Sequence, residues 1–214
     1  ASFTVRLLDR FPRVVATAAS TPDLTVTSKA VHSADNNEYE VPLPSSQSGD
    51  LLVMITSTTP HTVSVSGWTE LDSSSQSVGG LARRCTVLWR VADGSEGESA
   101  TAVLSGNSGI AMVAVRFRDA SINWAVTTPS VDLEWAGTSS PFDFAEGTPI
   151  HGNGDYWVLP FAAASEEGGV TTSPDGYPEL AETDGSFGEH WVRVWVGASF
   201  ETVTGSVEPG SISF

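Results

Sequence analysis

Histidine and cysteine are the residues most often used in catalysis or metal binding, and here neither has the spacing that such sites need. His32, His61, His151 and His190 are far apart, whereas a local zinc pair needs ligands two to four residues apart. Cys85 is the only cysteine, which excludes an intrachain disulfide and a thiolate metal cluster. It lies in an apolar segment, where a free cysteine is usually a small core residue. The sequence therefore predicts no metal and no cofactor.

Serine and carboxylate patterns also give no catalytic assignment. The segment 106–109, Gly-Asn-Ser-Gly, only superficially resembles a nucleophile elbow and is more typical of a turn. A Ser-His-Asp group assembled from distant loops is the alternative, although nothing singles out one serine. Asp93, Glu96 and Glu98 offer oxygen ligands for a loose calcium site, but a solvated acidic turn is the simpler interpretation. We predict a protein that is not an enzyme and has no catalytic residues.

Two aromatic residues beside turns support a binding hypothesis. Trp68 and Tyr177 each follow a glycine and precede a Glu-Leu pair by one residue. Exposed rings at such positions would stack on sugars, which makes Trp68 and Tyr177 the candidate carbohydrate-binding residues. The alternative is that both rings cap the hydrophobic core, because seven tryptophans are more than the surface of a soluble domain usually shows.

Composition excludes two classes of partner. The formal net charge of −16 disfavours nucleic-acid binding, because phosphate contacts need clustered lysine and arginine. The longest strongly apolar run is Leu51–Ile55, far shorter than the roughly 20 residues of a membrane helix. We therefore expect a soluble protein with neither a nucleic-acid nor a membrane partner.

The charge is divided unevenly between the two halves of the chain. Residues 1–118 hold 11 acids and 9 bases, whereas residues 119–214 hold 15 acids and one base, Arg193. This asymmetry is typical of a partner surface or of a solvated acidic face. The N-terminal segment, residues 1–23, contains Arg6, Arg10 and Arg13, and forms either an extra edge strand or an arm that reaches a neighbouring subunit. As an arm, these three arginines would dock on an acidic surface such as residues 119–214 of a neighbouring copy.

Short β-branched segments between turn residues predict an all-β fold. The predicted strands are Leu24–Val31, Leu51–Thr58, Thr62–Ser66, Cys85–Val91, Ala100–Leu104, Ile110–Phe117, Tyr156–Ala163, Val170–Thr172, Trp191–Gly197, Phe200–Thr204 and Ser206–Ser213. Ile110–Phe117 also fits helical spacing, but it is short, uncapped and rich in valine. Many short strands of this kind indicate an antiparallel β-sandwich or a jelly-roll-like fold.

Three motifs recur in the same order in both halves. Gly49–Val53 matches Gly154–Val158, Gly67–Leu71 matches Gly176–Leu180, and Val87–Val91 matches Arg193–Gly197. We predict a single sandwich domain over residues 24–214, made of two similar halves at about 24–120 and 121–214. One detail disagrees with the third match, because aligning the tryptophans of these strands places Arg193 opposite Val87.

The motif order resembles a β-sandwich module of virion proteins from tailed bacteriophages. The order is Gly-Asp-Leu-Leu-Val, Gly-Trp-Thr-Glu-Leu, Val-Leu-Trp-Arg-Val-Ala and Ala-Met-Val-Ala-Val-Arg-Phe-Arg, within residues 24–204. The resemblance implies a non-enzymatic structural subunit made in the host cytoplasm and located in the virion. A capsid decoration or cement protein is expected first, and a tail-associated protein second. The implied partners are a major capsid or tail protein and copies of the chain itself. The alternative is a carbohydrate-binding adhesion module of a phage tail or of a secreted protein.

Overall fold

Every regular element that the structure describes is a β-strand, and every strand pair is antiparallel. The computed structural model describes residues 2–10, 23–31, 36–78, 81–118, 129–136, 142–143, 154–164, 174–187, 190–203 and 211–212. The strands are β1 (Ser2–Arg10), β2 (Asp23–Val31), β3 (Glu38–Pro42), β4 (Leu51–Thr58), β5 (Val63–Val65), β6 (Thr69–Val78), β7 (Leu81–Val91), β8 (Ser99–Leu104), β9 (Ile110–Arg118), β10 (Ser130–Ala136), β11 (Phe142–Asp143), β12 (Gly154–Ala164), β13 (Glu179–Phe187), β14 (His190–Gly197), β15 (Ser199–Val203) and β16 (Ser211–Ile212). The predicted all-β, antiparallel sandwich is confirmed.

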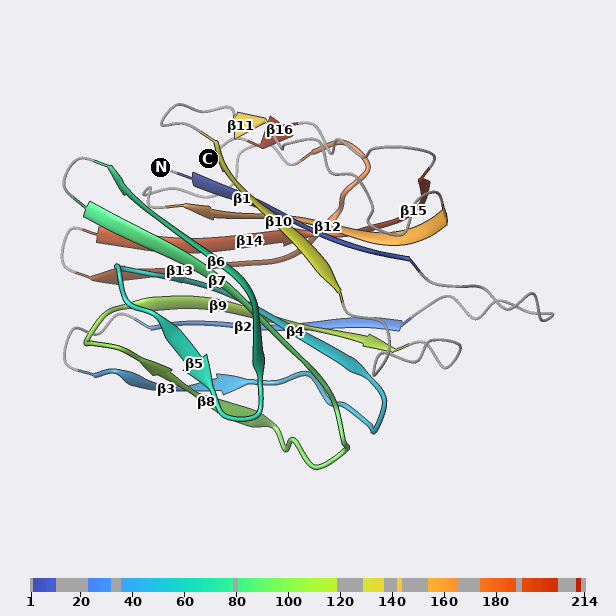
Figure 1. The fold of residues 1–214 in the computed structure, drawn as a ribbon, viewed down its shortest axis with the longest axis horizontal. Helices are drawn as coiled ribbons and strands as arrows, with labels where there is room; N and C mark the ends of the chain where they lie inside the picture. The colour runs from blue at the N-terminus through green and yellow to red at the C-terminus, as the bar shows by residue number, and fades with distance from the viewer. Residues whose placement is uncertain are drawn as a thin grey trace.

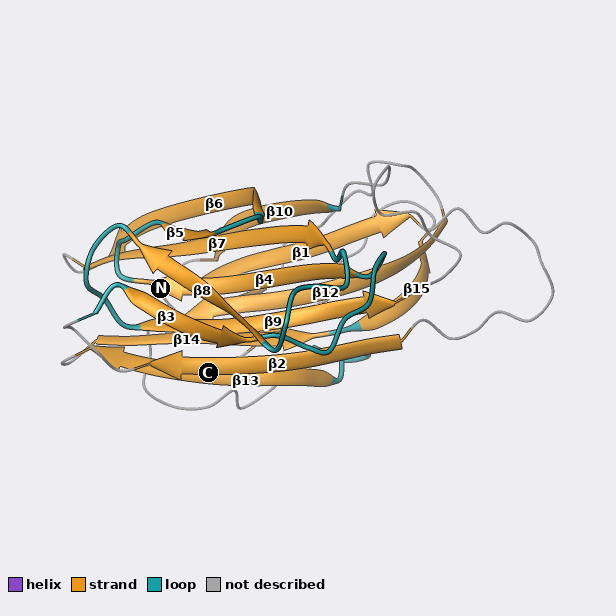
Figure 2. Ribbon diagram, turned by 90° about the horizontal axis from the view of Figure 1, so that it is seen from below, coloured by secondary structure: helices purple, strands orange, loops and turns teal. Residues whose placement is uncertain are grey.

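The strands form three layers (Figure 1). The central sheet has the order β2-β9-β4-β7-β6, and the large outer sheet has the order β10-β1-β12-β14-β13, with β15 also paired to β12. The small outer sheet, β3-β8-β5, covers the opposite face of the central sheet, with β8 running obliquely across it (Figure 2). Strands β11 and β16 form a separate short pair.

The inner strands β4 and β9 of the central sheet are buried on both faces, which explains their largely apolar sequences. All eight residues of β4 are buried, and Leu51, Val53 and Ile55 belong to the core shared with the large outer sheet. Met54, on the other face, belongs to the core shared with the small outer sheet. Residues 110–117 of β9 are buried in the same two-sided way, so their apparent helical spacing reflects two cores. The strand prediction for Ile110–Phe117 is confirmed.

Most predicted strands have bounds within four residues of those expected. Four strands that were not predicted share one feature, which is their position at the edge of a sheet. β3, β6, β10 and β13 each lie at the edge of a sheet and were not predicted. β6 contains the run Asp-Ser-Ser-Ser-Gln-Ser, which has no apolar alternation because its side chains are half-buried or exposed. The predicted segment Val170–Thr172 and residues 206–210 and 213 of Ser206–Ser213 lie outside the described residues.

Two features place the Gly-aromatic-x-Glu-Leu motifs at equivalent positions. Trp68 N donates to Val65 O at 3.1 Å, and Tyr177 N donates to Pro174 O at 3.2 Å. Gly67 and Gly176 have φ of 78° and 84°, as the third residue of a type II turn requires. The pairing of β6 with β7 shifts register between Glu70 and Asp72, and that of β13 with β14 shifts between Glu179 and Ala181. Both motifs therefore consist of a glycine turn followed by a bulge at the motif's leucine.

The third sequence match is wrong by three residues. Asp72 pairs with Val87 after the first bulge, and Ala181 pairs with Val196 after the second, so Val196 rather than Arg193 is the counterpart of Val87. Trp89 packs against the core between the central and large outer sheets. Val196 belongs to that core. Its neighbour Trp195 lies on the opposite face of the strand, where its side chain is fully buried. The two tryptophans therefore do not have equivalent roles.

The two larger sheets nevertheless have corresponding strand orders. β4-β7-β6 in the central sheet corresponds to β12-β14-β13 in the large outer sheet. On the other side of β4 lie β9 and β2, and on the other side of β12 lie β1 and β10. β1 therefore takes the place that β9 takes in the central sheet. The N-terminal segment thus adds an extra strand, one of the two predicted alternatives, but this strand is not at an edge, because β1 is paired on both sides.

Candidate functional site

The described side chains with the densest polar contacts lie at one end of the central sheet, where β4 begins and β7 and β9 end. Two loops meet there, residues 43–50 after β3 and residues 92–98 after β7. Backbone hydrogen bonds join them, from Leu43 N to Glu98 O at 2.8 Å and from Gly49 N to Ala92 O at 2.8 Å. Three of the sequence motifs meet at this end of the sheet: Gly-Asp before β4, Val-Leu-Trp-Arg-Val-Ala at the end of β7, and Arg-Phe-Arg at the end of β9.

Asp50 clamps the start of β4 to the end of β9. Its carboxylate accepts hydrogen bonds from Arg118 Nη2 at 2.7 Å and Arg118 Nε at 3.0 Å. It also accepts the Gln47 backbone N–H at 2.8 Å, which closes the turn before the strand. The Asp50 side chain is only 3% exposed, against 31% for Arg118. A bidentate, largely buried pair of this kind fixes the relative position of the two segments.

Arg116 secures the neighbouring edge of the sheet. Its side chain is 6% exposed and donates from Nη1 to Ser45 O at 2.7 Å and from Nη2 to Thr25 Oγ1 at 2.6 Å. It also forms an ion pair with the Asp23 carboxylate. One arginine therefore joins β9, β2 and the loop that follows β3.

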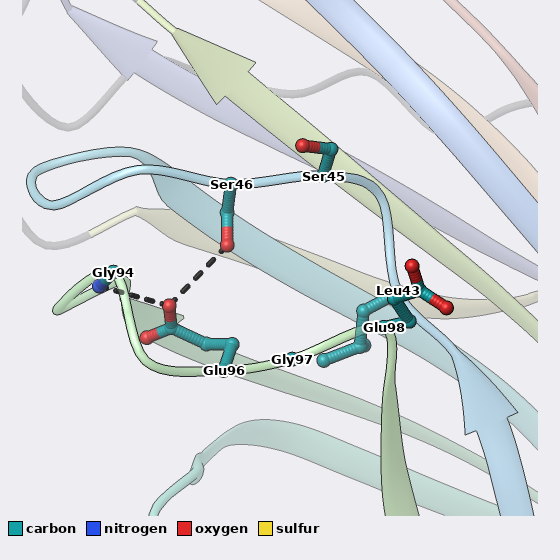
Figure 3. A pocket seen from close by; sticks show the side chains of 7 residues that line it. All are labelled: Leu43, Ser45, Ser46, Gly94, Glu96, Gly97 and Glu98. Carbon is teal, nitrogen blue, oxygen red and sulfur yellow. Dashed lines mark hydrogen bonds between the residues drawn. The ribbon is translucent and has the colours of Figure 1, made fainter.

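Glu96 organises the loop that follows β7. Its side chain is 1% exposed and accepts the backbone N–H groups of Asp93 at 2.7 Å and Gly94 at 3.0 Å. Arg90 contacts the same carboxylate at 3.0 Å, and Ser46 Oγ donates to it from the facing loop at 3.3 Å. Figure 3 shows the Ser46 and Glu96 side chains directed toward one another across the gap between the loops.

Two shallow pockets flank this loop pair. The larger, of about 510 Å³, lies between the loops and is lined by Leu43, Ser45, Ser46, Gly94, Glu96, Gly97 and Glu98 (Figure 3). The smaller, of about 290 Å³, has Trp68 as its aromatic wall, with Arg90, Asp93 and Thr101 among its polar groups. A flat ring beside charged and hydroxyl groups suits a ligand with one apolar face and several hydroxyls.

The structure separates the two predicted carbohydrate-binding residues. Trp68 is half-buried, packs against the core of the small outer sheet, and lines the smaller pocket. Tyr177 is 6% exposed, so its ring is not available to stack on a sugar. The binding hypothesis is therefore left with Trp68, which packs against a core and also lines a pocket.

The acidic residues proposed as a loose calcium site are engaged elsewhere. Glu96 is held by backbone N–H groups and by Arg90, and Asp93 accepts the N–H and the hydroxyl of Ser95 at 2.8 and 2.5 Å. Among the described residues there is no group of three or more His, Cys, Asp or Glu that could hold a metal ion. The carboxylates organise the loop.

The serine of the elbow-like segment is a structural residue. Ser108 is fully buried, and its hydroxyl accepts the Thr59 N–H at 3.2 Å and donates to Gly109 O at 2.8 Å. Nearby, Ser105 Oγ lies 3.5 Å from His61 Nδ1 and accepts the Thr62 N–H at 3.1 Å. A Cβ on Gly106 would approach the His61 ring to 2.5 Å, so the glycine is needed for this packing.

The three N-terminal arginines are placed only in part. Arg6 lies in β1 at the register position opposite Asp132 of β10 and Pro160 of β12, and Arg10 lies opposite Tyr156 of β12. Arg13 lies outside the described residues. Strand β1 thus carries two of the three candidate partner-binding residues into the middle of a sheet.

Shifted pKa values follow the same contacts. Burial raises the pKa of the Cys85 thiol, in agreement with its prediction as a core residue. Hydrogen bonding to Asp50 raises the pKa of Arg118, whereas hydrogen bonds from Ser95 lower the pKa of Asp93. Burial lowers the pKa of Arg83, which is 4% exposed. The shifts of Arg118 and Asp93 favour their ionised forms, the shift of Arg83 disfavours its ionised form, and the raised pKa of Cys85 keeps it as an unreactive thiol.

The sequence analysis did not identify the arginines that hold this end of the sheet together. Arg90, Arg116 and Arg118 each lie within motifs that were selected for their apolar pattern. Arginines flanking buried strands, together with the Gly-Asp turn, were the available signal. The partners of Arg116 and Arg118 are Asp23 and Asp50, which lie 93 and 68 residues away in the chain, and motif spacing does not predict pairs that far apart.

Comparisons of the chain with protein-family models, curated proteins and solved structures find no match. In the part of the chain that the structure describes, no helix has the length and apolar character needed to cross a membrane.

Proposed function

We propose that this chain is a non-enzymatic structural subunit of a tailed-bacteriophage particle, located in the virion. A capsid decoration or cement protein is the first assignment, and a tail-associated protein is the second. Its partners are then a major capsid or tail protein and further copies of the chain.

The observation that carries this proposal is that the motifs shared with the phage module all lie at points that define the scaffold. The Gly-Asp motif supplies Asp50, and the Arg-Phe-Arg motif supplies its partner Arg118. The Gly-Trp-Thr-Glu-Leu motif forms the turn at Gly67 and the bulge at Leu71. The resemblance therefore concerns a scaffold, which is what a structural subunit requires.

Peptide mass spectrometry of purified phage particles tests the assignment. We expect peptides of this chain in particles from the phage that encodes it, at hundreds of copies for a head or tail-tube position. A handful of copies would place it at a tip or connector. Particles that are complete but lack the chain would contradict the proposal.

A second candidate function is carbohydrate binding for adhesion, favoured by the pocket beside Trp68. Its lining combines the indole with Arg90, Asp93, Ser99 and Thr101, which could hydrogen-bond sugar hydroxyls while the ring covers the apolar face. This arrangement supports a single site, because Tyr177 is buried.

Trp68→Ala is expected to weaken glycan binding about tenfold or more, because it removes the only aromatic ring among the pocket's lining residues. Glycan-array screening followed by calorimetry measures the loss, and circular dichroism confirms folding. Trp68→Phe, which keeps a flat ring, should retain part of the affinity. Equal binding by the wild type and Trp68→Ala would exclude this pocket as the site.

A further inference from the structure

Strand β1 fills a place in the large outer sheet for which the second half of the chain has no strand of its own. In the central sheet, the place between β2 and β4 is filled by β9, which comes from the same half of the chain. In the large outer sheet, the equivalent place between β10 and β12 is filled by β1, from the opposite end of the chain. The second half therefore supplies no strand of its own for this place.

β1 makes complete strand pairing in this place. Ser2–Arg10 pairs with β12 over all nine residues, and Ser2–Leu8 pairs with β10 over seven. Val5 and Leu7 lie opposite Phe161 and Leu159, both of which belong to the main core. Without β1, the facing edges of β10 and β12 would have unpaired backbone groups. Such edges favour binding of the β1 segment, whether it comes from the same chain or from another copy.

Charge also favours β1 as the occupant. Residues 1–10 contain Arg6 and Arg10 against one acid, Asp9, and they enter a half that holds 15 acids and one base. Arg6 lies in register with Asp132. The attraction acts equally between copies, because every copy carries the same basic strand and the same acidic half.

The connection to β1 is long enough to reach another molecule. Residues 11–22 separate β1 from β2, which belongs to a different sheet. Twelve residues span up to about 40 Å when extended. Exchange of an identical terminal element keeps every pairing and costs little, so concentration decides between the two arrangements.

We propose that β1 is an exchangeable strand, and that two copies of this chain associate by each inserting β1 between β10 and β12 of the other. The partner surface is therefore the pair of strand edges offered by β10 and β12, and the partner is a second copy. This proposal goes beyond the virion assignment and does not depend on it, because purified protein suffices for its test.

Cysteine pairs across the β1–β12 register test the exchange. Thr4 and Ala162 are Cα partners, and directly opposed residues lie within the distance that a disulfide needs. Chains carrying only Thr4→Cys are mixed with chains carrying only Ala162→Cys, refolded together at high concentration and oxidised. We expect a disulfide-linked heterodimer on non-reducing gels, with an amount that rises with protein concentration. Oxidation is started only after refolding is complete, when Cys85 is buried.

Three controls make the outcome decisive. The double variant Thr4→Cys/Ala162→Cys, oxidised at high dilution, should form an intrachain disulfide and remain a monomer. Mixing Thr4→Cys with Ser64→Cys, an exposed position in the small outer sheet, should yield only collisional crosslinking. Ser2→Cys with Ala164→Cys repeats the test at the end of the register in case Ala162→Cys disturbs packing. An intrachain disulfide without any heterodimer overturns the proposal, as does the failure of both pairs to crosslink within one chain.

Discussion

Phe161→Ala is expected to lower the free energy of unfolding by about 3–4 kcal/mol, the cost of removing a large ring from a packed core. Phe161 is fully buried on β12 and belongs to the same core cluster as Phe117 and Val115 of the central sheet. Because the cavity would lie between two sheets, neither backbone can collapse freely to fill it. Urea unfolding followed by tryptophan fluorescence measures the change.

A surface substitution provides the matched control for this prediction. Val103 in β8 is 38% exposed, so Val103→Ala should change the stability by no more than about 0.5 kcal/mol. A cost below about 1 kcal/mol for Phe161→Ala would mean that the two larger sheets do not share one core.

Asp50→Ala is expected to cost about 2–3 kcal/mol, because it leaves the Arg118 guanidinium and the Gln47 N–H without their shared acceptor. Asp93→Ala removes a carboxylate that is 63% exposed and that forms an ion pair with Arg90. That change should cost clearly less than Asp50→Ala, because solvent screens an exposed pair. Chemical denaturation of both variants at pH 7 gives the comparison.

A double-mutant cycle separates the ion pair from other effects of the substitution. Combining Asp50→Ala with Arg118→Ala should recover about 1 kcal/mol or more relative to the sum of the single changes, because the orphaned arginine is removed. The equivalent cycle on Arg90 and Asp93 should show little coupling. If Asp50→Ala were no more costly than Asp93→Ala, the Asp50–Arg118 pair would not hold this end of the sheet.

Sequence-based prediction succeeded where a strand buries side chains in a core. Leu51–Thr58 was predicted with its observed bounds, because it begins with five apolar residues, continues with mostly β-branched residues and is preceded by a glycine turn. β6 and β13 were missed, because their described side chains are half-buried or exposed, so the strands are held by backbone pairing and show no apolar alternation. The Ser-rich segment of β6 therefore looked like a loop until its partner β7 was known.

The two copies of the Gly-aromatic motif show how local and tertiary information differ. Gly67 and Gly176 adopt the same turn, as the shared sequence predicts. Trp68 nevertheless lines a pocket, whereas Tyr177 is buried. The turn depends on a few neighbouring residues, but the burial of a ring depends on which distant segments pack over it.

The sequence by itself determined the strand-rich class, the turn positions and the two-part organisation, because these depend on glycine conformations and on short-range apolar alternation. Only the tertiary structure decided that β1 lies between β10 and β12 and that Asp50 pairs with Arg118. It also decided that Trp89 packs against the core between the two larger sheets, whereas Trp195 does not belong to that core. Each of these involves residues far apart in the chain. Their contacts depend on the order of strands in each sheet and on the pairing register. A shift of the register by one residue would move every side chain of a strand to the other face of the sheet.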